Sequence, residues 1–231
     1  MCRSRGPTPS STSRSDVGIR PFHFRQHGLS NAGTAMSCPP CAGLSRMRKL
    51  FLSIQVTLDG YACGPGGELD WSDTGDVELE RYFSEMLTTI DGMFFGRRAY
   101  QELAGFWPRA GSEPGELAVQ AGPMNKLPKY VVSGDPGLAL DWTPAVRVGD
   151  DLAAEVAGLK RQPGRDLAVF AGPSTTARFV ELGLVDEIRL IVFPVVLGDG
   201  RPPLPPGVRL SLVDSTTFAK SGVVILRYVP A

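Results

Sequence analysis

The sequence has few cysteines, few histidines and no excess of charge of either sign. Its 231 residues include four cysteines and two histidines, and 24 basic side chains balance 24 acidic ones. Three of the cysteines precede residue 42, so they do not form the disulfide framework of a small secreted domain. A chain without net charge offers no electrostatic attraction to nucleic acid or to an anionic membrane. We therefore expect neither partner and predict a reducing, cytoplasmic location.

Long apolar runs are also absent. No run approaches the roughly 20 residues that a helix needs to cross a bilayer. The N-terminus is basic but lacks the apolar segment of a secretory signal. Hydrophobic residues nevertheless make up 42% of the chain, which is enough for a globular core. Length and composition together predict one folded domain with a tail.

The first 46 residues differ in composition from the rest of the chain. They are rich in Ser, Arg, Pro and Gly and show neither a helical nor a strand period. Such a segment cannot bury enough apolar surface to offset the entropy lost on ordering. We expect residues 1–46 to be a disordered extension, or sequence that lies upstream of a natural start at Met47. The folded domain is expected over residues 47–231.

One pattern in this tail resembles a zinc site. His23 and His27 are four residues apart, and Cys38 and Cys41 form a Cys-x-x-Cys pair, so the four side chains match the number of ligands in a tetrahedral site. The order of the pairs is inverted relative to the usual finger, and no apolar pattern surrounds them. We favour a chance pattern in a biased segment and predict no metal site.

The segment from residue 166 to residue 200 is the most informative part of the sequence. Leu167–Phe170 and Ile188–Val196 are apolar runs typical of buried strands, and a helical segment lies between them. Ala171-Gly172 makes the first turn, and Ser174 is the expected cap of the helix. Free N–H groups at a helix start bind anions, so this β-α-β unit predicts a nucleotide phosphate at the turn.

Strands alternate with helices over most of the remaining chain. This alternation predicts a mostly parallel α/β sheet with helices on both faces, and the final strands 209–218 and 223–229 predict an antiparallel edge. Ligands of such sheets bind at the carboxyl ends of the strands. The other strands are expected over 50–58, 93–95, 130–132 and 146–148, and the helices after Asp76, after Gly96 and after Asp150 or Asp151.

Four segments, in this order, resemble the dihydrofolate-reductase-like family. They are Val56–Tyr61, Phe95–Tyr100, Lys129–Ser133, and Gly183–Glu187 continued through Pro194–Gly198. The nearest branch is the C-terminal reductase domain of the bacterial bifunctional deaminase-reductase of riboflavin biosynthesis. The resemblance spans nearly all of the predicted domain. It implies a three-layer α/β/α fold that binds NADPH, acts on a small molecule and forms a homodimer.

The resemblance also implies which residues contact the cofactor. Guanidinium groups bind phosphate through two parallel hydrogen bonds, which suits the two arginines that open the second helix. An acid, Asp135, follows the turn where the family often has a basic residue, so NADH stays open beside NADPH. The implied contacts are Gly96, Arg97, Arg98 and Ala99 at the phosphates, Ser133 and Gly134 beside the adenosine 2′-phosphate, and Ala171, Gly172, Pro173, Ser174 and Thr175 around the pyrophosphate.

The candidate proton donors are Asp59 and Glu80. Asp59 lies in the loop that leaves the first strand, and Glu80 lies on the flank of the apolar stripe of the first helix, where dihydrofolate reductases carry a carboxylate. The alternatives are a turn aspartate and a solvated helix carboxylate. Trp71 and Trp107 are candidates to stack on a flat ring, with ordinary packing as their alternative.

The function that follows is an NAD(P)H-dependent reductase of a small heterocyclic or ribosyl-pyrimidine substrate. The family activity implied is that of 5-amino-6-(5-phosphoribosylamino)uracil reductase. The folded zinc deaminase signature of the bifunctional protein is absent from the sequence, which indicates a stand-alone reductase domain. A non-catalytic nucleotide-binding module or scaffold on the same fold is the alternative.

Overall fold

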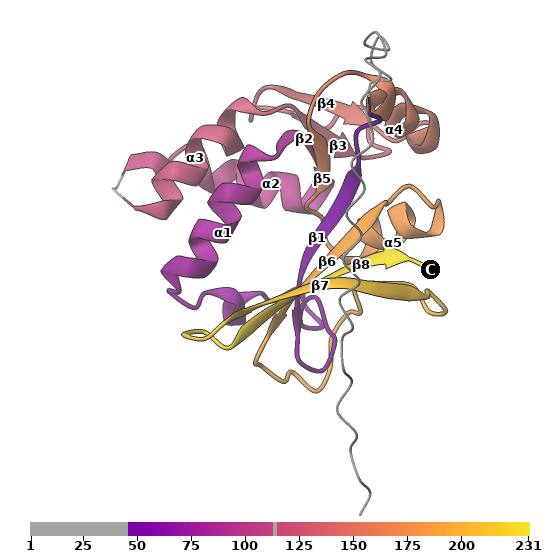
Figure 1. Ribbon diagram of the computed structural model, residues 1–231. Helices are drawn as coiled ribbons and strands as arrows, with labels where there is room; N and C mark the ends of the chain where they lie inside the picture. The colour runs from indigo at the N-terminus through magenta and orange to yellow at the C-terminus, as the bar shows by residue number, and fades with distance from the viewer. Residues whose placement is uncertain (1–45, 113–114) are drawn as a thin grey trace, which may run out of the picture. The chain divides into compact units, whose positions relative to one another are not determined.

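The computed structural model describes residues 46–112 and 115–231, and these form one sheet with helices packed on it (Figure 1). The strands are β1 (Leu50–Thr57), β2 (Ile90–Gly96), β3 (Lys129–Val132), β4 (Ala145–Val148), β5 (Asp166–Val169), β6 (Glu187–Phe193), β7 (Leu210–Phe218) and β8 (Val223–Pro230). The helices are α1 (Val77–Thr88), α2 (Arg97–Phe106), α3 (Glu116–Lys126), α4 (Leu152–Arg161) and α5 (Pro173–Glu181), with 3-10 turns η1 (Asp70–Ser72) and η2 (Ala110–Ser112).

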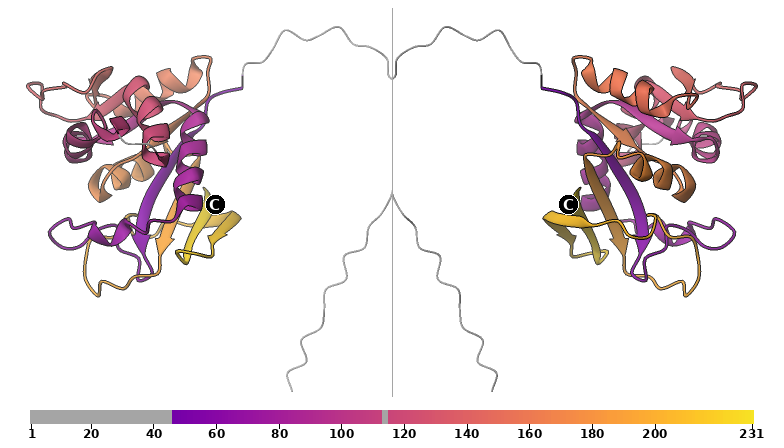
Figure 2. Two further views of the ribbon diagram at one scale, coloured as in Figure 1. Left: turned by 90° about the vertical axis from the view of Figure 1, so that its left-hand side faces the viewer. Right: turned by 90° about the vertical axis from the view of Figure 1, so that its right-hand side faces the viewer.

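The eight strands lie in the order β4-β3-β2-β5-β1-β6-β8-β7. Neighbours are parallel from β4 to β6, and β8 pairs antiparallel with both β6 and β7. The two further views show this closing pair in yellow at one edge of the sheet (Figure 2). The predicted fold class, a mostly parallel sheet with antiparallel C-terminal edge strands, is therefore confirmed.

Alternation along β1 explains how one strand serves two cores. Leu50 and Leu52 point to the face covered by α4 and α5, where they share a cluster with Val156 and Phe179. Phe51 points to the opposite face and shares a cluster with residues of α1, α2 and α3. Side chains of a strand alternate between faces, so a strand buried on both sides is apolar almost throughout. The sheet is the middle of three layers, as predicted.

The predicted helix caps and the predicted end of β6 agree with the structure in part. Asp76 caps α1 as expected, and of the two aspartates before α4 it is Asp151 that accepts a hydrogen bond from a helix N–H. The cap of α5 is Gly172 and not Ser174, because Pro173 occupies the first helical position, which its fixed φ suits. Strand β6 ends at Phe193, before Pro194, instead of reaching Val196.

A buried lysine lies in the packing behind the start of α2. Lys129 is fully buried, and its Nζ donates to the carbonyl oxygens of Asn125 (3.0 Å) and Leu127 (2.9 Å). The same ammonium lies 4.5 Å from the centroid of the Trp142 ring. Trp142 in turn donates its backbone N–H to the hydroxyl of Tyr100 on α2, at 2.9 Å. Burial lowers the pKa of Lys129 to about 8.

Lys129→Met is expected to remove a pH dependence of stability. The unfolded chain holds this proton up to the ordinary lysine pKa of about 10.4, whereas the folded chain loses it near pH 8. The unfolding free energy of the native sequence therefore rises with pH across this window, by up to about 3 kcal/mol for a complete shift. Denaturant titrations between these two pH values, on the variant and on the native chain, measure the difference. Lys126→Met changes an exposed neighbour and should keep the rise; an equal rise in Lys129→Met would contradict the assignment.

Candidate functional site

Turns that are distant in sequence meet at one edge of the sheet. The register pairs Gly96 of β2 with Val132 of β3, and Val169 of β5 with both Phe94 of β2 and Leu52 of β1. Parallel strands end at the same edge, so the turns that follow β3, β2 and β5 lie next to one another. These are the three turns in which the sequence predicts cofactor contacts.

The starts of α2 and α5 touch each other. A Cβ atom placed on Gly96 would lie only 2.4 Å from Oγ1 of Thr175, which shows how closely the two turns approach. Neither helix has a side chain that caps its first N–H groups, because the caps are Gly96 and Gly172. Two uncapped helix starts at one point present free N–H groups and the positive ends of two helix dipoles, a favourable arrangement for phosphate.

Two arginines add full positive charge at this point. Arg97 and Arg98 are the first residues of α2 and both are exposed. Among the described residues, neither has a carboxylate within ion-pair distance. Nη1 of Arg98 lies 3.8 Å from the Cβ position of Gly67, so this side chain reaches toward the loop after β1. Their guanidinium forks are therefore available to an anion.

An open peptide edge lies beside these turns. Strand β1 pairs with β5 only from Leu50 to Leu52, whereas it pairs with β6 as far as Thr57. The carbonyl of Lys49 accepts from the N–H of Leu167 on β5, so alternation directs the N–H and C=O of Gln55 to the same side, past the end of that ladder. The connection after β1 crosses one face of the sheet toward β2, whereas the connection after β5 crosses the other face toward β6. α/β proteins bind ligands where neighbouring strands are followed by connections that run in opposite directions.

The side chains around this edge are mostly apolar and aromatic. Gln55 is the only residue of β1 that is not buried, and it lies on the face of Phe51, toward α1. Its partner on β6 is Ile191, and Phe193 at the end of β6 packs edge-on against Trp71 with ring centroids 5.3 Å apart. One amide in an aromatic setting suits a flat, uncharged ring better than an ion.

Asp59 connects two loops in the structure. Its carboxylate accepts from the hydroxyl of Thr57 (2.6 Å) and from the N–H groups of Leu197 (3.1 Å) and Gly198 (2.7 Å). The Thr57 hydroxyl, followed by the Gly198 N–H, holds the pKa of Asp59 below its ordinary value. A carboxylate stabilised as an anion is a poor proton donor. These contacts favour a role in holding the loops after β1 and β6 together.

Asp59→Asn is expected to lower the melting temperature at neutral pH without moving the pH profile of any turnover. Asparagine can keep its amide oxygen toward the N–H groups of Leu197 and Gly198, but it loses the negative charge that strengthens these bonds and the bond that the Thr57 hydroxyl donates. The native chain has this stabilisation above the ordinary carboxyl pKa and loses it as pH falls through the lowered folded value, so the difference in melting temperature should vanish in acid. Thermal melts across pH measure this. Asp70→Asn, at an exposed aspartate, is the control; a shifted pH profile in Asp59→Asn would restore the proton-donor assignment.

Glu80 lies where α1 packs on α3. One carboxylate oxygen, Oε2, accepts from Nε2 of Gln120 at 2.8 Å, and Gln120 is buried. A second pair, the Ser84 hydroxyl and the carboxylate of Glu116, joins the same two helices at 3.0 Å. In the described part of the chain, no shared hydrogen-bond partner links Glu80 with Asp59. Asp59 therefore contacts the loops after β1 and β6, whereas Glu80 contacts α3, and the two carboxylates do not form a hydrogen-bonded pair.

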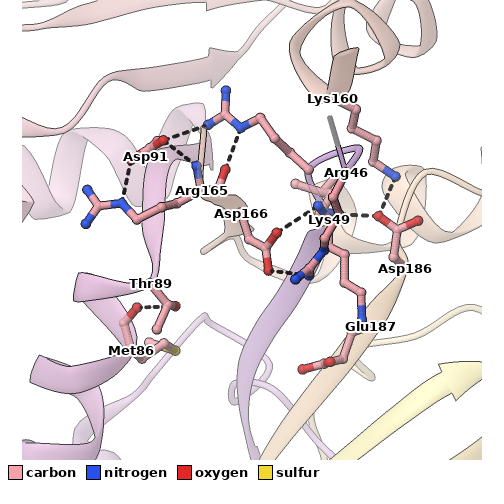
Figure 3. A network of polar contacts seen from close by, with 12 residues as sticks. Arg46, Lys49, Met86, Thr89, Asp91, Lys160, Arg165, Asp166, Asp186 and Glu187 are labelled. Atoms are coloured by element: carbon pink, nitrogen blue, oxygen red, sulfur yellow. Dashed lines mark hydrogen bonds and ion pairs between the residues drawn. The ribbon is translucent and has the colours of Figure 1, made fainter. Parts of the chain in front are cut away.

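The polar groups at the opposite edge of the sheet are paired with one another (Figure 3). A surface hollow of about 280 Å³ there is lined by Arg46, Arg48, Arg165 and Asp166, among others. Asp166 accepts from the backbone N–H of Lys49 and pairs with Arg46, and Arg165 pairs with the carboxylate of Asp91 at 2.7 Å. Charges that satisfy each other attract little else, so this network favours stability, and the carboxyl edge stays the candidate site.

Comparison with known proteins settles the family. A family model described as the RibD C-terminal domain matches residues 48–224. The chain belongs to the RibD C-terminal domain family. This RibD C-terminal domain is 33% identical to the uncharacterized protein YyaP of Bacillus subtilis (strain 168), over 79% of this chain and 95% of that protein. The predicted family is confirmed.

Solved structures agree with the fold of this RibD C-terminal domain. A provisionally named riboflavin biosynthesis protein of Shewanella sp. PV-4 superposes with a TM-score of 0.58 at 21% identity, covering 79% of this chain and 99% of that chain. The dihydrofolate reductase of Enterococcus faecalis, complexed with NADP(H), superposes with a TM-score of 0.54 at 13% identity, covering 79% and 96%. At these identities the likeness shows the shared fold.

The predictions about a metal site, a membrane span and the tail can be compared with the structure only over the described residues. Within residues 46–112 and 115–231 there is no group of three or more His, Cys, Asp or Glu side chains arranged to hold a metal ion. No helix in these ranges is long and apolar enough to cross a membrane. The pattern of His23, His27, Cys38 and Cys41 lies outside the described residues, as does the predicted disorder of the tail.

Proposed function

We propose that this RibD C-terminal domain is an NAD(P)H-dependent reductase of a small heterocyclic or ribosyl-pyrimidine substrate. The observation that carries the proposal is the meeting of two uncapped helix starts at Gly96 and Thr175, beside the unpaired Arg97 and Arg98. This arrangement supplies backbone donors, helix dipoles and guanidinium forks for a dinucleotide pyrophosphate. The NADP(H) bound by the Enterococcus dihydrofolate reductase, which shares the fold, supports the choice of cofactor.

The remaining residues fit the other parts of such a cofactor. The N–H and C=O of Gln55 have no backbone partner in the described part of the chain, and they would hold a carboxamide as a neighbouring strand would, which suits the nicotinamide. Ser133 and Gly134 would lie beside the adenosine end, with Ala99 and Ala171–Thr175 along the phosphates. Hydride transfer is the chemistry that the cofactor supplies when bound. The protein would orient the two rings and exclude water between them.

The substrate side is expected to hold a flat ring. Trp71 and Phe193 form an apolar wall, and the Gln55 amide offers one donor and one acceptor to a heterocycle. The name of the Shewanella relative, which refers to riboflavin biosynthesis, supports a ribosyl-pyrimidine. Of the two predicted acids, Glu80 is the better proton donor, because Oε1 has no hydrogen-bond partner in the described part of the chain. Asp59 is the second candidate.

A turnover assay with the full chain tests the proposal. The probes are NADPH and NADH, each offered with dihydrofolate and with the ribosylamino-uracil substrate of the family, while the near-ultraviolet absorbance of the reduced nicotinamide is followed. The proposal expects consumption of nucleotide that depends on a heterocycle. Binding of nucleotide without turnover of any heterocycle would favour the non-catalytic alternative, and absence of both would favour a scaffold.

We also propose that the domain is a homodimer. One side of β6 and β8 carries Leu190, Val192, Leu226 and Tyr228, all only partly buried, and Leu212 on β7 is 56% exposed. Apolar sheet surface of this kind is commonly covered by a partner. Sedimentation of the full chain and of Leu226→Lys distinguishes a native dimer from a monomer, and a native monomer would contradict the proposal.

A further inference from the structure

The end of strand β3 is enclosed by charged residues on two sides. The N–H of Ser133 donates to the carbonyl of Val148 at the end of β4, at 3.1 Å. On the other side, the pairing of Gly96 with Val132 places the start of α2 next to this turn. If the proposed function holds, the adenosine ribose lies here, so these charges decide what the ribose 2′ position can carry.

Asp135 is fixed in this turn as an exposed acid. Its backbone N–H donates to Oγ of Ser133 at 3.1 Å, and its Oδ1 accepts from the N–H of Gly137 at 2.9 Å. These two bonds fix the backbone and the carboxylate of Asp135 within the turn, two residues after Ser133. Oδ2 has no partner among the described residues, so it is available to accept from a hydroxyl. It would repel a phosphate at the same distance.

The basic residue nearest to Ser133 is occupied by another acid. Nη1 of Arg147 donates to the carbonyl of Ser133 at 3.1 Å and to Oδ1 of Asp150 at 2.8 Å, and its Nη2 donates to Oδ2 of Asp150 at 3.0 Å. The hydrogen bonds and charge of Asp150 raise the pKa of Arg147, and Asp135 adds to this effect. A guanidinium whose fork is filled by a carboxylate has little left for a phosphate.

The charges around the turn therefore nearly cancel. The acids beside this turn are Asp135, Asp150 and Glu155, whose carboxylate accepts from the N–H of Gly149. The bases are Arg147, Arg97 and Arg178, which donates to the carbonyl of Gly149 at 3.2 Å, so the set is neutral. A neutral set gives no net attraction to a phosphate that carries close to two negative charges. A carboxylate at the end of a strand, by contrast, is the group that hydrogen-bonds the ribose 2′-hydroxyl in dinucleotide-binding sheets.

We propose that this end of the site selects NADH over NADPH, with Asp135 as the specificity-determining residue and Asp150 as the residue that withholds Arg147 from a 2′-phosphate. The proposal rests on the proposed function, since it requires a nicotinamide dinucleotide at the carboxyl edge. It goes beyond the resemblance, which implies NADPH. Specificity here would come from a repelling charge as much as from a new contact.

Dissociation constants for NADH and NADPH, measured by calorimetry on the full chain, test this without any need for turnover. The native chain should bind NADH at least about tenfold more tightly, the effect of roughly one uncompensated charge contact. Asp135→Asn keeps Oδ1 for Gly137 but removes the charge, and should reduce the ratio about tenfold. Asp150→Asn should tighten NADPH severalfold and leave NADH unchanged. Asp141→Asn, in the same connection but exposed and outside these contacts, is the control.

The outcomes separate the two proposals. A preference for NADH that shifts in Asp135→Asn and not in Asp141→Asn supports the assignment. Tighter binding of NADPH by the native chain, or a ratio that Asp135→Asn leaves unchanged, overturns the specificity proposal while the cofactor site stands. Failure of both nucleotides to bind overturns the proposed function together with this inference.

Discussion

Gly96→Ala is expected to weaken the binding of a reduced nicotinamide dinucleotide by about tenfold to a hundredfold. The new Cβ would lie 2.4 Å from Oγ1 and 3.3 Å from Cβ of Thr175, so the Thr175 side chain must rotate or the starts of α2 and α5 must separate. The backbone at Gly96, with φ −77° and ψ 160°, accepts alanine, so the effect comes from the contact and not from backbone strain. Overpacking of this kind costs about 1–3 kcal/mol, and it would disturb the two turns that we propose to bind phosphate. Calorimetric titration and a denaturant melt measure the two effects.

Two matched variants make this result specific. Gly105→Ala, also in α2, meets nothing within 4 Å, so it should leave affinity unchanged and stabilise the helix slightly. The double variant Gly96→Ala with Thr175→Ala removes the oxygen that clashes and should recover most of the lost stability. Native affinity in Gly96→Ala alone would show that the contact between the two helix starts does not shape the binding site.

Arg97→Ala combined with Arg98→Ala is expected to reduce nucleotide affinity by about a hundredfold to ten-thousandfold. Hydrogen bonds to charged groups contribute about 1.5–3 kcal/mol each, and this variant removes two guanidinium forks that no carboxylate occupies in the described part of the chain. The loss should be larger at low salt, since salt screens exposed charges. Titrations of the native chain and the variant at two salt concentrations give both quantities.

The control for this pair is Arg161→Ala. Arg161 is an exposed residue in the last turn of α4, so its loss matches the residue type and one of the two removed charges while leaving the start of α2 intact. Affinity should stay native in this control. If the double variant binds as tightly as the control, the phosphates lie elsewhere, and the starts of α2 and α5 are no more than a packing contact.

Local features of the fold could be predicted because they depend on neighbouring residues. The aspartates before α1 and α4 cap those helices through bonds two or three residues away, and both are visible as a polar residue before an apolar stripe. The cap of α5 could not be read in the same way. Pro173 fits the first helical position better than Ser174 fits a cap, and only the backbone decides between them.

Contacts between residues that are distant in the chain could not be predicted from the sequence. In the sequence, Asp59 is a candidate proton donor or a turn aspartate, and nothing near it indicates that Leu197 and Gly198, almost 140 residues later, donate to its carboxylate. The open edge at Gln55 depends on where the β5 ladder ends, which is a property of register. Arg147 was missed for the same reason, although a charged residue between two valines at the end of a short strand is a usable signal for a position that is only partly buried.

The central claim is that the carboxyl edge of the sheet binds a nicotinamide dinucleotide. Calorimetric titration of the full chain with NADH and with NADPH, repeated on the Arg97→Ala, Arg98→Ala double variant, tests it most directly. We expect saturable binding with a dissociation constant on the order of micromolar for the preferred nucleotide, and a large loss of affinity in the variant. Binding of neither nucleotide by a folded native chain, or equal binding by the native chain and the variant, would contradict it.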